Sequence, residues 1–455
     1  MRVSAVSIVT LLTALLLVAP ARASAQPPAD PPSADDTTIL PHAEDSRWWL
    51  SGQLNVISQA HGVFPSPYEG ENSLRAVHER ATSRVWTIYT GVQISRRTEL
   101  LLDVESAGGR GLSDALGVAG FTNLDVVRNP TLGSAPYLAR LMLHHVIALS
   151  AETTKAGRGA LSLSTELPAR RLEIRAGKFG LVDFFDLNAV GGDSHLQFTN
   201  WTIDNNGAYD YAADTRGYTW GAIVEYDAPR WSLRGAEALM PKVANGIEMD
   251  WNLSRARGEN LELELRPRDG LTVRALAFVN HANMGSYDEA IQAFRAGVDA
   301  RPDIDAHRQQ GRRKEGAGGN VEYAIGRSVR VFGRAGWNEG HNESFAYTEV
   351  NNSWQGGGDI SGGWWSRGRD RMGVAAVSNG LSAAHAEYLA LGGLGFLLGD
   401  GALRYGREDI VEAYYTAHLW RGVSASAGLQ HIAHPGYNQD RGPVLVSASR
   451  LHLDF

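Results

Sequence analysis

The sequence predicts an all-β protein, a transmembrane antiparallel β-barrel of about 16 strands with an inward-folded constriction loop and short loop helices. Three features indicate this fold: the end of the chain, its N-terminus, and a side-chain alternation that recurs between them. The chain ends on Arg450-Leu451-His452-Leu453-Asp454-Phe455, so a strand there has one apolar and one ionic face. An apolar face toward lipid, an ionic face toward water and a terminal aromatic at the interface suit a barrel. The same residues would also suit the edge strand of a soluble sandwich.

The N-terminal residues favour the barrel over the sandwich. Arg2 precedes an apolar stretch at 6–20, and an Ala-x-Ala pattern follows that ends at Ala25. This is the pattern of a secretory signal peptide, so we expect residues 1–25 to be removed. A membrane anchor would need about 20 apolar residues, and this stretch is shorter.

Two further regions follow the expected cleavage site. Residues 26–46 are rich in Pro and Asp, which is typical of a disordered segment, here a periplasmic tail. Residues 47–455 show no second change of composition and no repeat of fixed period. We therefore expect one outer-membrane barrel domain at 47–455.

Composition excludes several classes of protein. The formal net charge is −7 and the chain has no Cys, so there is neither a basic excess for nucleic acid nor a disulfide or thiolate metal site. The mean hydropathy of −0.23 resembles that of a soluble protein. Polar residues that face the lumen lower the hydropathy of every barrel strand, so this value is compatible with a membrane barrel.

The strands themselves are predicted by alternation with a period of two. Leu261, Leu263 and Leu265 face one way, whereas Glu262 and Glu264 face the other. Segments that read as strands lie at 47–59, 83–94, 98–105, 137–149, 171–178, 218–226, 230–239, 259–266, 271–281, 315–325, 328–337, 353–361, 371–378, 408–419, 422–432 and 443–455. An even number near sixteen is what a single-chain barrel requires, and it leaves an aqueous channel.

Three connecting segments have a character of their own. Residues 284–298 and 381–398 show helical spacing or helix-forming composition, and we expect both to cover a mouth of the barrel. Residues 179–217 are long, aromatic and without sustained alternation. Such a loop is uncommon unless it is functional, so we expect it to be ordered and to narrow the channel. The alternative is that its aromatic side chains only pack the loop against the wall.

A series of short motifs carries a resemblance to a known family. The motifs are Ser66-Pro67-Tyr68, Asn72-Ser73-Leu74, Gly111-Leu112-Ser113, Ala119-Gly120-Phe121, Gly177-Lys178-Phe179, Gln197-Phe198, Asn200-Trp201, the run from Ala213 to Gly221, Ala244-Asn245-Gly246, the run from Met284 to Tyr287, Gly336-Trp337-Asn338, the run from Asn379 to Ser382, Gly399-Asp400-Gly401, the run from Glu412 to Tyr415, Tyr437-Asn438 and the run from Asp440 to Val444. Each motif is weak alone, but their order and spacing make a chance match improbable. In these motifs the chain resembles the carbohydrate-selective porin family, of the OprB type, over nearly all of its expected mature length.

The resemblance implies an outer-membrane channel of a Gram-negative-type bacterium. Monosaccharides and small oligosaccharides would diffuse through a narrow, charged eyelet, with no energy source and no cofactor. One departure stands out: where the family commonly has an arginine, this chain has His195. Histidine is ordinarily neutral near pH 7, so a fixed cation would be lost there.

The candidate substrate-binding residues follow from the long loop and its flanks. Aromatic faces suit sugar rings, and Asp, Asn and Arg suit sugar hydroxyls. The residues expected at the eyelet are Glu105, Arg140, Lys178, Asp183, His195, Asn200, Trp201, Asp214, Arg216 and Trp220. The expected partners are sugars as solutes, outer-membrane lipid, and the barrel-assembly machinery through the C-terminal strand. A homo-oligomer is compatible with the sequence.

Enzyme chemistry is not supported. His144 and His145 are adjacent on a predicted strand and so point to opposite faces, which does not suit a metal site. No Gly-x-Ser-x-Gly motif is present. The alternative function is an outer-membrane enzyme or receptor that uses the barrel as an anchor. A periplasmic sugar-binding β protein is disfavoured by Phe455 and by the rows of leucine.

Overall fold

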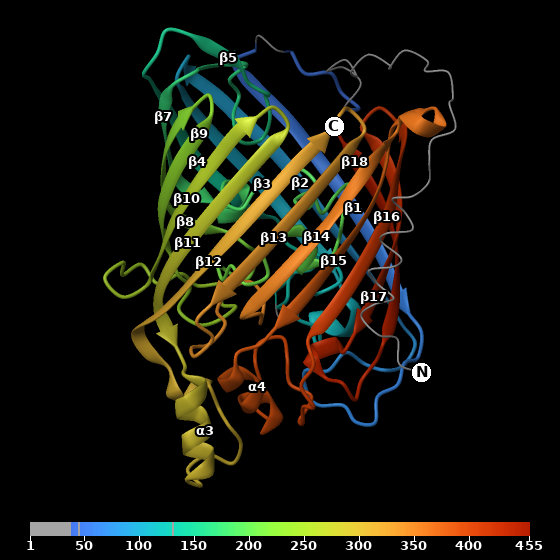
Figure 1. Ribbon diagram of the computed structural model, residues 1–455. Coiled ribbons are helices and arrows are strands. Elements are labelled where there is room, and N and C mark those ends of the chain that lie inside the picture. Colours follow the sequence, from blue (N-terminus) through green and yellow to red (C-terminus); the bar gives the residue numbers. More distant parts are fainter. Residues whose placement is uncertain (1–37, 44–45, 130–131) are drawn as a thin grey trace. The chain divides into compact units, whose positions relative to one another are not determined.

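The computed structural model describes residues 38–43, 46–129 and 132–455. The expected signal peptide lies outside the described residues, as does most of the expected tail at 26–46. The described part of the chain forms a closed antiparallel barrel of 16 strands, so the predicted fold is confirmed. Figure 1 shows the strands running obliquely around the barrel.

Every predicted strand corresponds to one strand of the barrel. The barrel strands are β1 (Trp48–His61), β2 (Glu79–Ser95), β3 (Thr98–Gly109), β4 (Tyr137–Ala148), β7 (Arg171–Phe179), β8 (Thr219–Ala228), β9 (Trp231–Leu239), β10 (Arg257–Arg268), β11 (Leu271–Met284), β12 (Gln309–Ile325), β13 (Val329–Asn338), β14 (Asn352–Gly362), β15 (Arg367–Gly380), β16 (Glu408–Trp420), β17 (Val423–Ala433) and β18 (Val444–Asp454). Each pairs with its neighbours in the order of the chain, and β1 pairs with β18 to close the ring. Two short strands, β5 (Thr153–Lys155) and β6 (Glu166–Pro168), were not predicted and form a separate two-stranded sheet.

The alternation places ionic residues inside the barrel and apolar residues outside. On β10, Leu261, Leu263 and Leu265 are 54%, 37% and 40% exposed on the outer face. Glu262 and Glu264 are buried on the inner face. This is the arrangement of a membrane barrel, in which the outer row meets lipid and the inner row meets a polar lumen.

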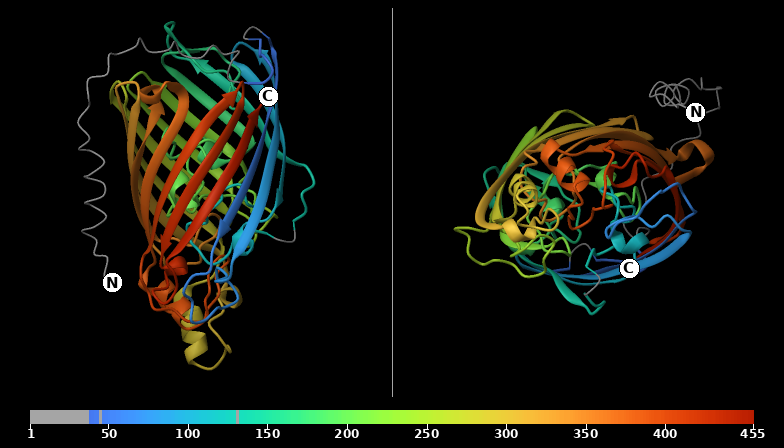
Figure 2. Two further views of the ribbon diagram at one scale, coloured as in Figure 1. Left: turned by 90° about the vertical axis from the view of Figure 1, so that its right-hand side faces the viewer. Right: turned by 90° about the horizontal axis from the view of Figure 1, so that it is seen from below.

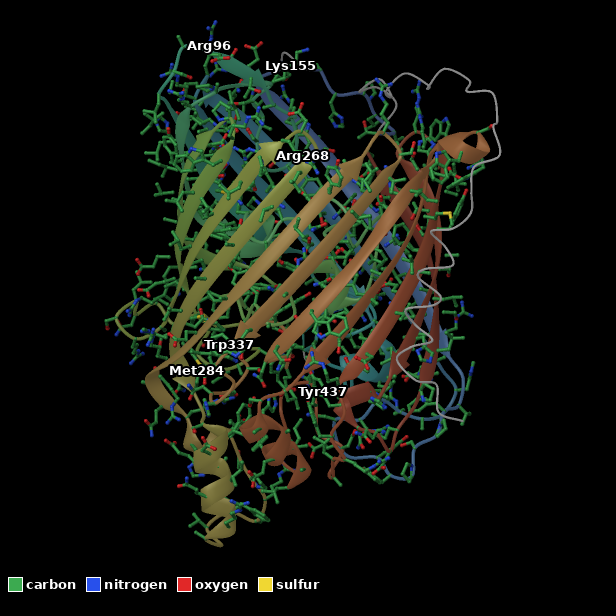
Figure 3. The ribbon with its side chains drawn as sticks, in the orientation of Figure 1. Arg96, Lys155, Arg268, Met284, Trp337 and Tyr437 are labelled. Atoms are coloured by element: carbon green, nitrogen blue, oxygen red, sulfur yellow. The ribbon has the colours of Figure 1, made fainter. Side chains whose placement is uncertain are left out.

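The two ends of the barrel differ in their connections. Short turns join β2 to β3, β8 to β9 and β10 to β11 at the end where the chain finishes, and we call this the terminal end. Apart from the connection between β4 and β7, the long connections lie at the opposite end, which we call the loop end. Figure 3 shows Arg96 and Arg268 at the terminal end and Trp337 and Tyr437 toward the loop end.

Both predicted helices are present at the loop end, but each is shorter than expected. Helix α3 (Tyr287–Arg295) begins later because Met284 is still the last residue of β11. Helix α4 (Ala383–Ala390) ends before the Gly392-Gly393 pair, where Gly392 adopts a φ of 89° that helices do not use. No helix among the described residues is long and apolar enough to cross a membrane.

Exposed tryptophans mark both ends of the outer face. Trp48 and Trp420 are 72% and 56% exposed near the terminal end, and Trp337 and Trp354 are 52% and 60% exposed near the loop end. Rings of aromatic side chains at the two interfaces are typical of membrane barrels. Phe455 completes the terminal end, because its backbone N–H donates to the Gly52 carbonyl at 2.9 Å.

Candidate functional site

The long connection between β7 and β8, residues 180–218, lies inside the barrel, and we call it the inward loop. Its Asp186 carboxylate pairs with Arg334 of β13 at 2.9 Å. The Thr199 N–H donates to Glu412 of β16 at 2.8 Å, and Arg450 of β18 donates to the Gln197 carbonyl at 3.0 Å. The loop is therefore ordered and spans the lumen, as Figure 2 shows in the view from below.

A second segment also enters the barrel, from the connection between β3 and β4. Its Phe121 ring packs edge-on against Trp201 of the inward loop, at 5.8 Å between centroids. The Trp201 indole N–H donates to the Asn123 carbonyl at 2.8 Å, and the Asn200 amide donates to the Gly120 carbonyl at 2.7 Å. The two segments thus support each other within the lumen.

This contact explains the roles of Asn200 and Trp201. Asn200 is fully buried and caps the four-residue helix α2 (Trp201–Asp204) by accepting a bond from the Thr202 N–H. Trp201 is 7% exposed and stacks on Tyr347 at 5.6 Å. Both side chains hold the inward loop together and have little surface left for a solute. For these two positions the structure favours the packing alternative.

A group of charged and phenolic side chains gathers on the wall formed by β3 and β4. Glu105 accepts hydrogen bonds from the Tyr137 hydroxyl at 2.5 Å and the Tyr218 hydroxyl at 3.1 Å. Arg140 pairs with Asp103 on one side and with Asp183 at 2.6 Å on the other. The ends of the inward loop therefore meet the β3–β4 wall at this point.

Lys178, Asp214 and Arg216 complete the same group. The Lys178 ammonium lies 3.8 Å from Asp214 and 5.7 Å from the centre of the Tyr218 ring. The Arg216 guanidinium lies 3.9 Å above the Tyr137 ring. We call the whole group the wall cluster; it consists of Asp103, Glu105, Tyr137, Arg140, Lys178, Asp183, Asp214, Arg216 and Tyr218.

Asp214 and Arg216 do not pair through their side chains. The Asp214 carboxylate accepts bonds from the backbone N–H groups of Arg216 at 2.9 Å and Tyr218 at 3.2 Å. Burial raises the pKa of Asp214, and the nearby Lys178 opposes that rise. The Arg216 guanidinium instead borders a cavity of about 310 Å³, together with Tyr137, Arg110 and Asp114. Arg216 is therefore the cation of the wall cluster that is best placed to meet a solute.

His195 lies on another side of the lumen, beside β18. Its ring stacks on His452 at 5.4 Å, and its Nε2 is 3.3 Å from the Asp125 carboxylate. Burial is the largest single effect and opposes protonation of His195, but the charge and hydrogen bond of Asp125 together with the charge of Asp193 raise the pKa of His195 to about 9. The surroundings of His195 therefore favour a charged ring near pH 7, in contrast to the neutral ring expected from an isolated histidine.

Trp220 lies apart from the other candidates. It shares the outer face of β8 with the exposed Val224 and packs against Trp251, at 5.8 Å between ring centroids. Trp251 is 68% exposed, so this pair belongs to the outer surface near the loop end. Its placement away from the lumen could have been read from the alternation with Glu225, which faces inward.

The sequence analysis did not identify Asp103, Tyr137 or Tyr218. Tyr218 stands inside one of the family motifs, so its position there was the available signal. Tyr137 begins β4, and Asp103 shares the inner face of β3 with Glu105. Because Asp103 and Glu105 are two positions apart on one strand, they share a face, and this spacing would have identified Asp103.

The inner wall beyond β7, formed by β8 to β12, carries charges in alternating pairs. Arg234 of β9 pairs with Glu225 at 2.9 Å and Glu262 at 2.6 Å. Arg274 of β11 pairs with Glu264 at 2.9 Å and Glu322 at 3.1 Å. We call the inner face of β8 to β12 the paired wall. Neighbouring opposite charges cancel at a distance, so this wall presents many polar groups without a strong net field.

Comparisons with known proteins agree with this architecture. The structure of Pseudomonas putida OprB at high pH superposes with a TM-score of 0.67 and 14% identity, covering 90% of this chain and 94% of that one. The outer-membrane channel DcaP of Acinetobacter baumannii gives 0.50 and 9%, covering 90% and 97%. These identities establish the fold alone.

Sequence comparison establishes the family. A search of curated proteins gave no match. The family model described as "Carbohydrate-selective porin, OprB family" matches residues 78–455. The chain therefore belongs to the carbohydrate-selective porin family and is a passive sugar channel of the Gram-negative outer membrane, not an enzyme.

Proposed function

We propose that monosaccharides and small oligosaccharides pass between the inward loop and the β3–β4 wall, and that the wall cluster is the site they contact. The observation that carries this proposal is the anchoring of the inward loop. Its middle part is tied to β13, β16 and β18 through Asp186, Thr199 and Gln197. Its two ends reach the β3–β4 wall through charged and phenolic side chains, with Asp183 on Arg140 and Tyr218 on Glu105.

The chemistry of the wall cluster suits sugar hydroxyls. Carboxylates accept hydrogen bonds from hydroxyl groups, guanidinium and ammonium groups donate to them, and phenols do both. The rings of Tyr137 and Tyr218 add apolar faces for a sugar ring. The paired wall has no strong net field, which favours uncharged solutes. Each contact is exchangeable with water, so binding stays weak enough for the sugar to leave.

We further propose the membrane context of the chain. Residues 1–25 would direct export, 26–46 would form a periplasmic tail, and the barrel domain at 47–455 would contact lipid through rows such as Leu261, Leu263 and Leu265. The C-terminal strand with Phe455 would be read by the barrel-assembly machinery. A homo-oligomer remains compatible with the outer face.

Planar-bilayer recording tests the proposed site. Glucose and maltotriose titrated onto the purified channel should reduce the ion current. Tyr218→Phe should weaken this block, because the Glu105 carboxylate loses a donor and the sugar loses a hydroxyl partner. Tyr226→Phe is the matched control, because Tyr226 is on the outer face of β8 against Trp231, at 4.9 Å between ring centroids. Equal block in both variants would refute the site, and a protein without ion current would favour the membrane-anchor alternative.

A further inference from the structure

The connection between β4 and β7 is the exception at the terminal end. It runs from residue 149 to 170 and carries the β5–β6 hairpin, whereas the neighbouring connections there are short turns. Figure 1 shows β5 above that rim, and Figure 3 places Lys155 there. The tip of the hairpin, residues 159–164, turns back toward the barrel, and we call it the strap.

The strap is docked on the inner face of β2 and β3. Leu163 is 1% exposed, and a methyl group at Gly91 of β2 would lie 2.9 Å from its Cδ1 atom. The same methyl group would lie 2.8 Å from Leu101, which is fully buried on the inner face of β3. The adjacent Leu100 and Leu102 are each 37% exposed on the outer face. The Leu163 side chain thus occupies space inside the barrel that the absence of a side chain at Gly91 provides.

A single carboxylate holds the strap in place. Glu99 of β3 accepts hydrogen bonds from the Leu163 N–H at 3.0 Å, the Ser162 hydroxyl at 3.1 Å and the Ser164 hydroxyl at 2.6 Å. Glu99 is buried and also faces His144 of β4 at 3.2 Å. Three donors from consecutive residues on one buried carboxylate define one position of the strap.

The strap and the wall cluster lie on the same line along the barrel. Glu99, Leu101 and Asp103 follow one another on the inner face of β3, and Asp103 pairs with Arg140 of the wall cluster. Alternate residues of a strand are roughly 7 Å apart, about the length of one sugar ring. A solute that leaves the wall cluster along β3 toward the terminal end therefore meets the strap next, at the half-buried Ser162, with Leu163 buried beneath it against β2 and β3.

We propose that the strap is a second constriction in series with the wall cluster, and that Ser162, held in place by the buried Leu163, helps to set the largest sugar that passes. This inference rests on the proposed path along the β3–β4 wall. Glu99 is a positioning residue here, because it acts through the strap and not on the solute. The competing explanation is that the strap only seals the edge of the barrel rim and lies beside the path.

Because the chain contains no Cys, cysteine labelling can separate these explanations. Ser162 is half-buried at the strap, whereas Thr154 is exposed on β5 and serves as the matched control. Both Ser162→Cys and Thr154→Cys are recorded in planar bilayers before and after a cationic methanethiosulfonate reagent, and mass spectrometry confirms labelling. We expect a stepwise loss of conductance and weaker glucose entry for the labelled Ser162→Cys variant, and no change for labelled Thr154→Cys or for the wild type.

A second variant tests the size limit directly. Leu163→Ala removes the apolar anchor that fixes the strap to β2 and β3, so the strap should yield more easily and entry of maltotriose into liposomes should rise relative to entry of glucose. Heat-modifiable migration confirms that the barrel is folded. Full labelling of Ser162→Cys with unchanged current, or failure of the reagent to reach it, would overturn the strap proposal while leaving the sugar channel intact. If the wild-type channel shows no sugar block at all, the proposed path fails first.

Discussion

At the scale of single residues, the structure separates two charges that are close in the sequence. Arg216 lies over Tyr137 at the edge of a cavity, whereas Asp214 is engaged by two backbone N–H groups and by Lys178. We expect Arg216→Ala to shift ion selectivity toward cations, because the substitution removes a positive charge from the lumen. Among the described residues, the Arg216 guanidinium has no carboxylate within ion-pair distance, whereas Asp214 has Lys178. Asp214→Asn should change selectivity less, since Lys178 already offsets its charge. Reversal potentials in a salt gradient measure both, and an unchanged potential for Arg216→Ala would contradict its exposure to the solute.

His195 provides a pH-dependent contribution to stability. Its pKa is raised to about 9 by Asp125, so the pair stabilises the folded protein fully below the ordinary histidine value of about 6.5. That contribution is lost as the pH rises through about 9. We expect it to reach about 1–3 kcal/mol, since the His195 side chain is 26% exposed and solvent screens the pair. The unfolding temperature of wild type should fall between pH 7 and 10 by more than that of His195→Gln. Parallel curves for the two proteins would exclude the His195–Asp125 pair as the cause.

At the scale of elements, β10 shows what the two faces of a strand tolerate. Leu263→Arg should reduce folded barrel strongly, because a cation on the lipid face costs about 2–4 kcal/mol near the bilayer midplane. Glu262→Gln should be mild, since the amide oxygen can still accept from the Asp186 N–H and Arg234 keeps Glu225 as a partner. The heat-modifiable fraction in outer membranes measures the difference. Similar losses of folded barrel in both variants would contradict the assignment of Leu263 to the lipid-facing side and Glu262 to the lumen-facing side of β10.

The strands were predictable because a period of two requires only the identity of neighbouring residues. Strands β5 and β6 were not, since three residues each are too few to show alternation. Prediction of the site was less complete, because the site depends on contacts between segments that are distant in the sequence. Alternation tells which face a residue occupies, but it cannot tell that Phe121 and Tyr347 arrive from distant parts of the chain to bury Trp201. The charge of His195 likewise depends on Asp125, which lies 70 positions earlier in the sequence and contacts it only after folding.

At the scale of the whole molecule, the closing pair of strands determines assembly. The Phe455 N–H and carbonyl both bond to Gly52, at 2.9 Å and 2.6 Å, where β18 meets β1. Phe455→Asp should therefore lower the amount of barrel inserted into the outer membrane, at a cost below the about 2–4 kcal/mol of a midplane cation. Phe455→Trp should retain insertion, because an aromatic ring remains at the interface. Normal insertion of the Asp variant would show that this ring is dispensable.

The pairing of the first barrel strand with the last also has a consequence for synthesis. The Ser51 hydroxyl donates to the Phe455 carbonyl, a contact that joins residues 404 positions apart. Until β18 has been made and exported, β1 has an open edge with unpaired N–H and C=O groups, which lipid cannot satisfy and which other chains can join. A partly translocated chain therefore has no stable membrane-inserted form of its own. Export of the polypeptide has to be complete before the barrel closes, and the waiting chain needs protection from aggregation during that interval.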